Sequence, residues 1–409
     1  MARPALRSGE FVSLVALLIS LVALSTDAML PALPAIGHDL GTPRPNDVQF
    51  VITSLFVGLG LGQIVFGPLS DSIGRKPAIH TGLVLYMTGC LMSILSPTFA
   101  VMIAGRVLQG FGVAGPRVVT VALVRDQYEG RQMARLMSFA ISVFILVPTV
   151  APALGQGILW LGGWRAIFTT FFAIAAFAFA WVALRQPETL PASRRRPLSP
   201  RAIGGAVLEV LRIRPALGYT LASGCALAPF VGYLSSAQQI FQDAYGTGAL
   251  FPVYFGVLAL AIGVASLVNG RLVLKHGMRP LVTTATVAIT LVSIVGWTLA
   301  FRFDGLPPLW LFMAYLLVVF FFFGLVFGNL NALAMGPLGH IAGVGAAVVA
   351  ALSTFIALPL GAFVGQNFDG TMYAQIAAFA IFGTGAFAAI RWAEAKPSVG
   401  PGHDAIDRS

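Results

Sequence analysis

The chain has 409 residues, of which 57% are hydrophobic and 10% charged, and its formal net charge is +10. Soluble domains carry about 25% charged residues and need a charged surface around any core, so this composition argues against a water-soluble protein. The basic residues lie in short loops between apolar stretches, a pattern of membrane topology that offers no basic face to nucleic acid. The two cysteines, Cys90 and Cys225, lie in apolar runs and have neither metal-ligand nor disulfide spacing.

Twelve apolar stretches are long enough to cross a membrane as helices, which need about 20 residues, whereas barrel strands need about 10. In chain order they cover residues 11–36, 48–68, 77–95, 99–124, 134–160, 164–184, 215–240, 250–273, 280–301, 308–335, 341–366 and 371–392. The first stretch resembles a secretory signal, but its apolar character continues to Ile36, which favours a retained helix. The predicted fold is therefore an all-α membrane protein.

Residues 185–214 interrupt this pattern with four prolines and three consecutive arginines. They predict a solvated cytoplasmic linker between two six-helix bundles. The resulting domains are residues 1–184, the linker 185–214, residues 215–393 and a cytoplasmic tail, 394–409.

An internal repeat supports two pseudo-symmetric halves. Residues 67–77 read GPLSDSIGRKP and residues 270–280 read GRLVLKHGMRP, each in the loop after the second span of its half. Glycine, leucine, glycine and proline match at an offset of 203 residues. Two parallel bundles around a central pathway are implied, and the alternative is a chance likeness between two glycine-rich turns.

The distribution of basic residues predicts the orientation. With the N-terminus inside, 20 of the 25 Lys and Arg residues fall in inner segments and only Arg44, Arg165 and Arg302 fall outside. The other two, Arg106 and Arg117, lie in the fourth span. Because positive residues favour the cytoplasmic side, both termini are expected to be cytoplasmic.

Asp27 is the only one of the 15 acidic residues that falls well inside a predicted span. A carboxylate at mid-membrane costs roughly 2.5–3.5 kcal/mol on insertion scales, and protonation or pairing lowers that cost. Counting 1.5 Å per residue, Asp27 and Arg106 lie about 5 Å and about 8 Å to the outer side of their span midpoints, whereas Arg117 lies about 8 Å to the inner side. We expect Arg106 to pair with Asp27 at a proton-coupling site, and the alternative is a static ion pair that locks two helices together.

The loop after the second span has the residue types of a gate. Its candidate residues are Gly67, Asp71, Gly74, Arg75 and, in a later loop, Asp126. Glycine allows a tight turn, and Asp71 is expected to accept from backbone N–H groups at a neighbouring helix start. Arg75 is expected to reach Asp126 or Glu129. The alternative is a solvated turn with ordinary positive-inside charge.

Two further groups are candidates for the pathway. Pro148 and Pro152 predict a bend in the fifth span, with plain helix packing as the alternative. The candidate lining of a substrate cavity comprises Arg117, Tyr233, Gln238, Asn329 and Asn331. Hydrogen bonding between helices is at least as good an explanation for these polar residues. The run of four phenylalanines, residues 320–323, receives no role.

No phosphate loop, metal cluster or nucleophile constellation occurs in the sequence. We therefore expect neither catalytic residues, nor a metal, nor a cofactor, and we expect that the protein is not an enzyme.

These residues resemble the major facilitator superfamily, in its drug–proton antiporter branch and the bacterial Bcr/CflA group. The likeness is carried by residues 67–77, 25–36 (STDAMLPALPAI), 106–110 (RVLQG) and 163–168 (GWRAIF). It implies a monomeric bacterial inner-membrane transporter that exports small amphipathic drugs in exchange for protons. By this likeness Asp27 is the proton-linked site, Arg106 its coupled partner and the 67–77 loop the inner gate. One departure is Ala151–Pro152, where the group usually has Gly–Pro.

Two other functions remain open from the sequence. A proton-coupled importer of a nutrient, such as an amino acid or a sugar, would share this fold, and only the direction of flux distinguishes the two. A membrane sensor or a lipid-modifying enzyme would need a receptor domain or a catalytic cluster, and the sequence has neither.

Overall fold

The computed structural model describes residues 8–128, 130–195 and 197–395, and within them the chain is helical without a β-strand. Helices satisfy every backbone N–H and C=O group internally, as a lipid environment requires. Eleven helical runs in the described residues are long and apolar enough to cross a membrane. One of these runs, residues 146–185, lies in α6 and extends across the boundary between the predicted fifth and sixth spans. The predicted all-α, twelve-span fold is therefore confirmed.

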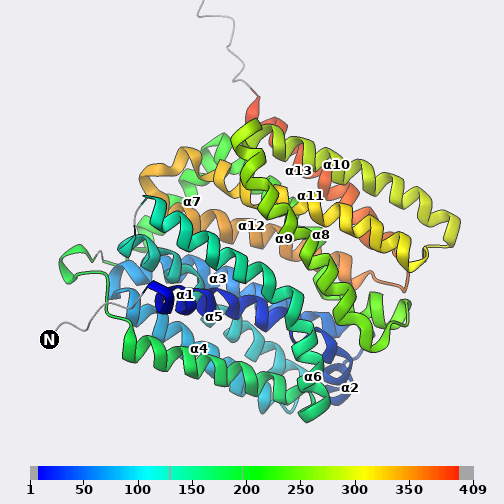
Figure 1. Ribbon diagram of the computed structural model, residues 1–409, viewed down its shortest axis with the longest axis horizontal. Coiled ribbons are helices and arrows are strands. Elements are labelled where there is room, and N and C mark those ends of the chain that lie inside the picture. The colour runs from blue at the N-terminus through cyan, green and yellow to red at the C-terminus, as the bar shows by residue number, and fades with distance from the viewer. Residues whose placement is uncertain (1–7, 129, 196, 396–409) are drawn as a thin grey trace, which may run out of the picture.

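The first half comprises α1 to α6, coloured blue to green in Figure 1. Its elements are α1 (Ser8–Asp27), η1 (Leu30–Ala32), α2 (Leu33–Leu40), η2 (Pro45–Gln49), α3 (Phe50–Ile73), α4 (Arg75–Ile94), α5 (Phe99–Gln127) and α6 (Gly130–Arg185). α6 breaks at Gly163, whose φ of 72° lies outside the helical region and separates the two spans. α5 packs against α1, α3 and α4, and α1 also packs against α6.

The second half comprises α8 to α13. Its elements are α8 (Arg214–Gln238), the π-helix η4 (Gln239–Ala244), η5 (Gly248–Leu250), α9 (Phe251–His276), α10 (Met278–Ala300), η6 (Phe301–Phe303), α11 (Leu309–Met335), η7 (Gly336–Ile341), α12 (Ala342–Gln366) and α13 (Tyr373–Glu394). α8 packs against α11, α12 and α13, as α5 does against its neighbours in the first half.

The segment between the halves differs from the solvated linker that the sequence predicts. It contains η3 (Ala192–Arg194) and an amphipathic helix, α7 (Pro200–Arg212), which packs against α8 and α12. Ala206 and Val210 of α7 are buried, and Glu209 forms an ion pair with His340 of η7 at 2.6 Å. Three charged residues within 13 positions, Arg201, Glu209 and Arg212, hid this helix from a search for apolar stretches.

The internal repeat has the same backbone form in both halves. Gly74 joins α3 to α4 with φ 108° and ψ 161°, and Gly277 joins α9 to α10 with φ 79° and ψ 165°. Both conformations disfavour a side chain, which explains why glycine occupies the matched position.

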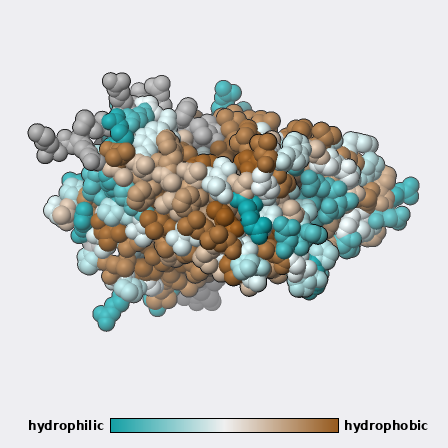
Figure 2. All heavy atoms as spheres, turned by 90° about the horizontal axis from the view of Figure 1, so that it is seen from below, coloured by the Kyte–Doolittle hydropathy of each residue, from teal (hydrophilic) through white to brown (hydrophobic). Residues whose placement is uncertain are grey.

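The halves meet along two helix pairs. α3 packs against α12, and a Cβ on Gly60 would lie 3.4 Å from the ring of Phe355, while one on Gly67 would lie 3.6 Å from Ala347 Cβ. α6 packs against α9, where a Cβ on Gly256 would lie 2.8 Å from the carbonyl oxygen of Thr149. On the face drawn in Figure 2, hydrophobic residues dominate the middle and hydrophilic ones gather towards the ends, as expected for a membrane-embedded surface.

Candidate functional site

Asp27 is the last residue of α1, at the point where the first helix is interrupted. Pro31 lies four residues on and has no N–H to give to the carbonyl of Asp27, so the helix cannot continue regularly. The side chain is 5% exposed and forms no hydrogen bond or ion pair with any residue that the structure describes. Within the described part of the chain, Asp27 is therefore a buried carboxyl group without a partner.

Arg106 does not form the predicted ion pair with Asp27. Its guanidinium group is fully buried and donates from Nη2 to the carbonyl oxygen of Ser25 at 2.9 Å, from Nε to that of Val51 at 2.9 Å, and from Nη1 to Gln109 Oε1 at 2.5 Å. The carbonyl of Ser25 is in the last turn of α1, where carbonyls lack helical partners and a cation is favourable. Arg106 thus holds the end of the helix that carries Asp27 and does not contact its carboxyl group.

A buried polar network continues from Arg106 through the first half. The hydroxyl groups of Ser25 and Tyr86 lie 2.6 Å apart, and Gln109 Nε2 donates to Cys90 Sγ at 3.0 Å. Ser25, Tyr86 and Gln109 were not predicted from the sequence as members of one network, although Gln109 lies three residues from Arg106 on the same helix face.

The residues predicted to line a cavity do not form one site. Gln238 Nε2 donates to Gln242 and Asp243 at the far end of α8. Asn329 pairs with Asn269 of α9, and Asn331 donates to the carbonyl of Phe327 in its own helix. For these three residues the structure gives the alternative explanation, hydrogen bonding within and between helices.

The other residues predicted to line the pathway lie in α5, α6 and α8. Arg117 of α5 is half-buried and has no hydrogen-bond or ion-pair partner among the described residues. Tyr233 of α8 is buried, and its hydroxyl group has no partner among them either. Pro148 and Pro152 lie within α6, which continues through both.

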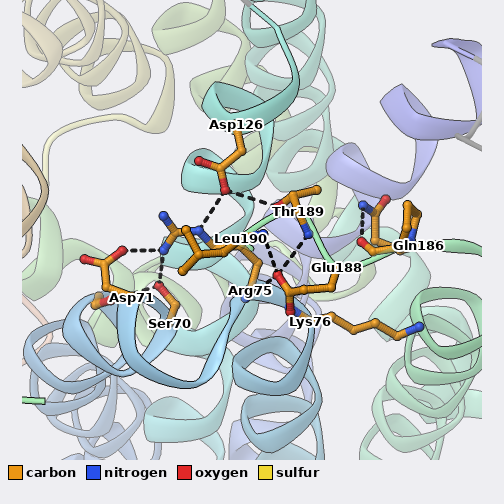
Figure 3. Close-up of polar contacts among 11 residues, drawn as sticks. Ser70, Asp71, Arg75, Lys76, Asp126, Gln186, Glu188, Thr189 and Leu190 are labelled. Atoms are coloured by element: carbon orange, nitrogen blue, oxygen red, sulfur yellow. Dashed lines mark hydrogen bonds and ion pairs between the residues drawn. The ribbon is translucent and has the colours of Figure 1, made fainter. Parts of the chain in front are cut away.

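A charged cluster joins α3, α4, α5 and the linker (Figure 3). Arg75 donates from Nη1 to Asp71 Oδ1 at 2.5 Å and to Ser70 Oγ at 2.8 Å, and from Nε to Asp126 Oδ2 at 2.9 Å. Thr189 Oγ1 donates to the same oxygen of Asp126 at 3.1 Å. The predicted contact between Arg75 and Asp126 is therefore present, whereas Glu129 lies outside the described residues.

Glu188 of the linker takes the role that the sequence predicted for Asp71. Its carboxylate accepts from the backbone N–H groups of Arg75 at 3.0 Å and Lys76 at 3.1 Å, at the start of α4. A carboxylate at this end of a helix satisfies unpaired N–H groups and complements the helix dipole. A Cβ on Gly74 would lie 2.5 Å from Glu188 Oε2, so the absence of a side chain there permits the contact.

At the opposite end, amide side chains link the two halves. Gln49 Nε2 donates to Gln239 Oε1 at 2.5 Å and to the carbonyl of Gly365 at 3.0 Å. Asn46 Nδ2 donates to the carbonyl of Gln366 at 3.0 Å, and Gln366 Nε2 returns a bond to the carbonyl of Asn46 at 2.8 Å. No local sequence pattern predicts this network, because its members are far apart in the chain. We call Asn46, Gln49, Gln239 and Gln366 the amide network.

A hollow of about 480 Å³ lies beside the amide network. It is lined by Arg44, Pro45, Asn46, Gln239, Asp243, Gln366, Phe368, Asp369 and Gly370. Hydrogen bonds from Thr371, from Oγ1 at 2.6 Å and from N at 2.9 Å, lower the pKa of Asp369, which keeps this wall of the hollow charged.

Two helical halves that pack against each other, with a buried carboxyl group on the first, are the architecture of a membrane transporter. The family model described as Major Facilitator Superfamily matches residues 15–362, and the chain belongs to this superfamily.

Curated relatives cover most of the chain. It is 30% identical over 358 residues to "Uncharacterized MFS-type transporter YdgK" of Bacillus subtilis, covering 87% of this chain and 88% of that protein. It is 31% identical over 304 residues to "Chloramphenicol resistance protein" of Pseudomonas aeruginosa, covering 71% and 70%. It is 30% identical over 276 residues to "Bicyclomycin resistance protein homolog" of Haemophilus influenzae, covering 67% and 69%.

Solved structures share the fold. The chain matches a D-xylose–proton symporter with a TM-score of 0.74 at 15% identity, over 95% of this chain and 98% of that one. It matches the human organic anion transporter MFSD10 with a TM-score of 0.69 at 18% identity, over 94% and 99%. At these identities the likeness concerns the fold alone.

Proposed function

We propose that the protein exports small amphipathic compounds, including antibiotics, from the cytoplasm in exchange for protons. The observation that carries the proposal is Asp27, a buried carboxyl group at the end of α1 that has no partner in the part of the chain that the structure describes. The printed names of two relatives, chloramphenicol and bicyclomycin resistance proteins, support export of antibiotics. No metal, cofactor or catalytic residue enters this proposal.

Asp27 supplies the chemistry for proton coupling. An ionised carboxylate that is taken out of water without a partner is unfavourable, and a bound proton removes that cost. A cationic or hydrogen-bonding compound would remove it as well. Because proton and compound satisfy the same group, they compete, and this competition is the basis of the proposed exchange.

Arg106 would support this exchange as a positioning residue. Its bond to the carbonyl of Ser25 ties the last turn of α1 to α5, so the carboxyl group would stay at the interface in both protonation states. The cluster of Asp71, Arg75 and Asp126 would hold the inner side closed, with Gly67 packed on α12 and Gly74 at the turn. Bending of α6 at Pro148 and Pro152 would accompany opening.

The test is flux of chloramphenicol in proteoliposomes with an imposed pH gradient. We expect gradient-driven flux in the wild type and its loss in Asp27→Asn, with binding of the compound retained. The matched control is Asp304→Asn, an exposed acid whose left-handed backbone (φ 47°) asparagine tolerates. Equal gradient dependence in Asp27→Asn would remove the coupling role from this residue. Accumulation in the direction of import would favour the nutrient importer.

The orientation has its own test. The proposal includes an inner-membrane location with both termini in the cytoplasm. It also includes the boundaries of the two halves and the monomeric state. We expect a green fluorescent protein fused after residue 409 to be fluorescent. We expect an alkaline phosphatase fused at the same place, in a separate variant, to be inactive. The reverse would invert every inner and outer assignment.

A further inference from the structure

The hydroxyl group of Tyr233 is a buried polar group that the fold does not use. The residue is 1% exposed, and its oxygen has no hydrogen-bond partner among the described residues. Leaving a buried hydroxyl unpaired is costly, and phenylalanine would fill the same space without that cost. The unpaired hydroxyl group therefore indicates a hydrogen-bond partner that is not part of the protein itself.

Aromatic rings surround Tyr233 on the side of the second half. Its ring stacks on Phe255 of α9 at 6.0 Å between centroids and meets Phe320 of α11 edge-on at 4.8 Å. Phe230, one helical turn earlier on α8, stacks at 6.4 Å and also contacts Phe320 at 5.6 Å. Such rings bind other aromatic rings through stacked and edge-on contacts.

Asp27 lies across the interface from Tyr233. η1, which begins three residues after Asp27, packs against α8, the helix that carries Tyr233. Neither group has a hydrogen-bond partner among the described residues, although both are buried. Two unsatisfied polar groups, one from each half, therefore lie in the same region.

α6 and α9 pack around this region. Phe255, which stacks on Tyr233, precedes Gly256, where α9 touches the backbone of Thr149 on α6. The Thr149 hydroxyl group is buried and also lacks a partner among the described residues. Further along α6, Gly155 lies against Ala28, the residue after Asp27. Elements of both halves thus converge around one polar centre with an aromatic wall.

We propose that Tyr233 and Asp27 form a two-sided subsite for compounds that carry a hydroxyl or amide group close to an aromatic ring. The inference rests on the proposed function and names the chemistry of its substrates. Asp27 accepts from the compound's O–H or N–H group, and the Tyr233 hydroxyl, which can donate and accept, pairs with a second polar atom. The rings of Phe230, Phe255 and Phe320 pack against the aromatic part. Tyr233 is thus a specificity-determining residue that acts from the half opposite Asp27.

The test compares two compounds on purified protein in detergent, with affinity measured from the ligand-dependent shift in unfolding temperature. Chloramphenicol has hydroxyl and amide groups beside an aromatic ring, whereas tetraphenylphosphonium has aromatic rings and no hydrogen-bonding group. We expect Tyr233→Phe to weaken chloramphenicol binding roughly three- to tenfold, the range of one neutral hydrogen bond, and to leave tetraphenylphosphonium binding unchanged.

The control is Tyr245→Phe, which removes a hydroxyl group that donates to the carbonyl of Pro307 at 2.8 Å. We expect this change to lower the unfolding temperature without altering either affinity, and Tyr233→Phe to keep or raise the unfolding temperature. Three results would each overturn the subsite. They are an unchanged chloramphenicol affinity in Tyr233→Phe, an equal loss of affinity for both compounds, and no binding of chloramphenicol to the wild type. Selective loss of binding without gradient-driven flux would support the subsite and overturn the transport proposal instead.

Discussion

Gly155 of α6 lies directly against the backbone of Ala28, the residue that follows Asp27. A Cβ at position 155 would lie 1.6 Å from the carbonyl oxygen of Ala28 and 2.6 Å from its carbonyl carbon. The obstacle is backbone that cannot rotate away, so the close approach of α6 to the interrupted end of α1 depends on glycine.

Gly155→Ala should therefore force the two helices apart. We expect a loss of at least about 1–3 kcal/mol in stability, the usual cost of overpacking, together with loss of transport because Asp27 moves with α1. Thermal unfolding in detergent and flux in proteoliposomes are the measurements. Gly157→Ala, two residues along the same helix and with no heavy atom within 4 Å of a new Cβ, is the matched control and should have little effect. Equal behaviour of the two variants would contradict the close contact.

The independence of Arg106 from Asp27 gives a second prediction. Removing the guanidinium group in Arg106→Ala leaves the carbonyls of Ser25 and Val51 without their donor and opens a cavity, so we expect a loss of about 3–5 kcal/mol. Asp27→Asn removes an unpartnered charge and should not destabilise the protein.

Because the two groups share no hydrogen bond, their effects should be additive. We expect the double variant to differ from the sum of the single variants by less than about 0.5 kcal/mol in unfolding free energy. A larger coupling would restore the direct ion pair that the sequence led us to expect.

Glu188 provides a third prediction, at the charged cluster that joins α3, α4, α5 and the linker. Glu188→Gln weakens the charge that the linker places on the N-terminus of α4, at a cost of about 1 kcal/mol. Hydrogen exchange at the amides of Arg75 and Lys76 should accelerate about fivefold, the factor that corresponds to this energy. Glu209→Gln alters the other acid of the segment, which contacts His340, and should leave those amides unchanged. Unchanged exchange in Glu188→Gln would show that the linker does not hold the start of α4.

The sequence predicted the spans and the repeated glycine turn because both depend on local pattern: the length of an apolar run and a backbone conformation that favours glycine. The contact between Arg75 and Asp126 followed from the topology, since both residues end up at the same side of one half. The partner of Arg106 did not follow. Counting residues gives the depth of a side chain along its helix, but it does not show which neighbouring helix the side chain faces.

The other missed residues share a physical reason. Glu188 reaches α4 only because the segment after α6 folds back on the bundle, which no local pattern encodes. Gln49 and Gln239 meet across the halves at a separation of 190 residues. Asn329, by contrast, was assigned to a cavity because an amide in a span is costly, yet Asn269 satisfies it in the neighbouring helix.

The amide network gives the last prediction, because alternating access requires the ends of the two halves to separate in turn. Asn46 and Gln366 come from different halves and exchange two hydrogen bonds, so a short cross-link between them should hold this end closed. We expect a cleavable thiol cross-linker to stop flux in Asn46→Cys/Gln366→Cys, in a chain with Cys90→Ala and Cys225→Ala, and cleavage to restore it. Each single-cysteine variant should transport normally after the same treatment. Full flux through the cross-linked protein would show that the halves do not part at the amide network, and the outer gate would then have to lie elsewhere along the contact of α3 with α12.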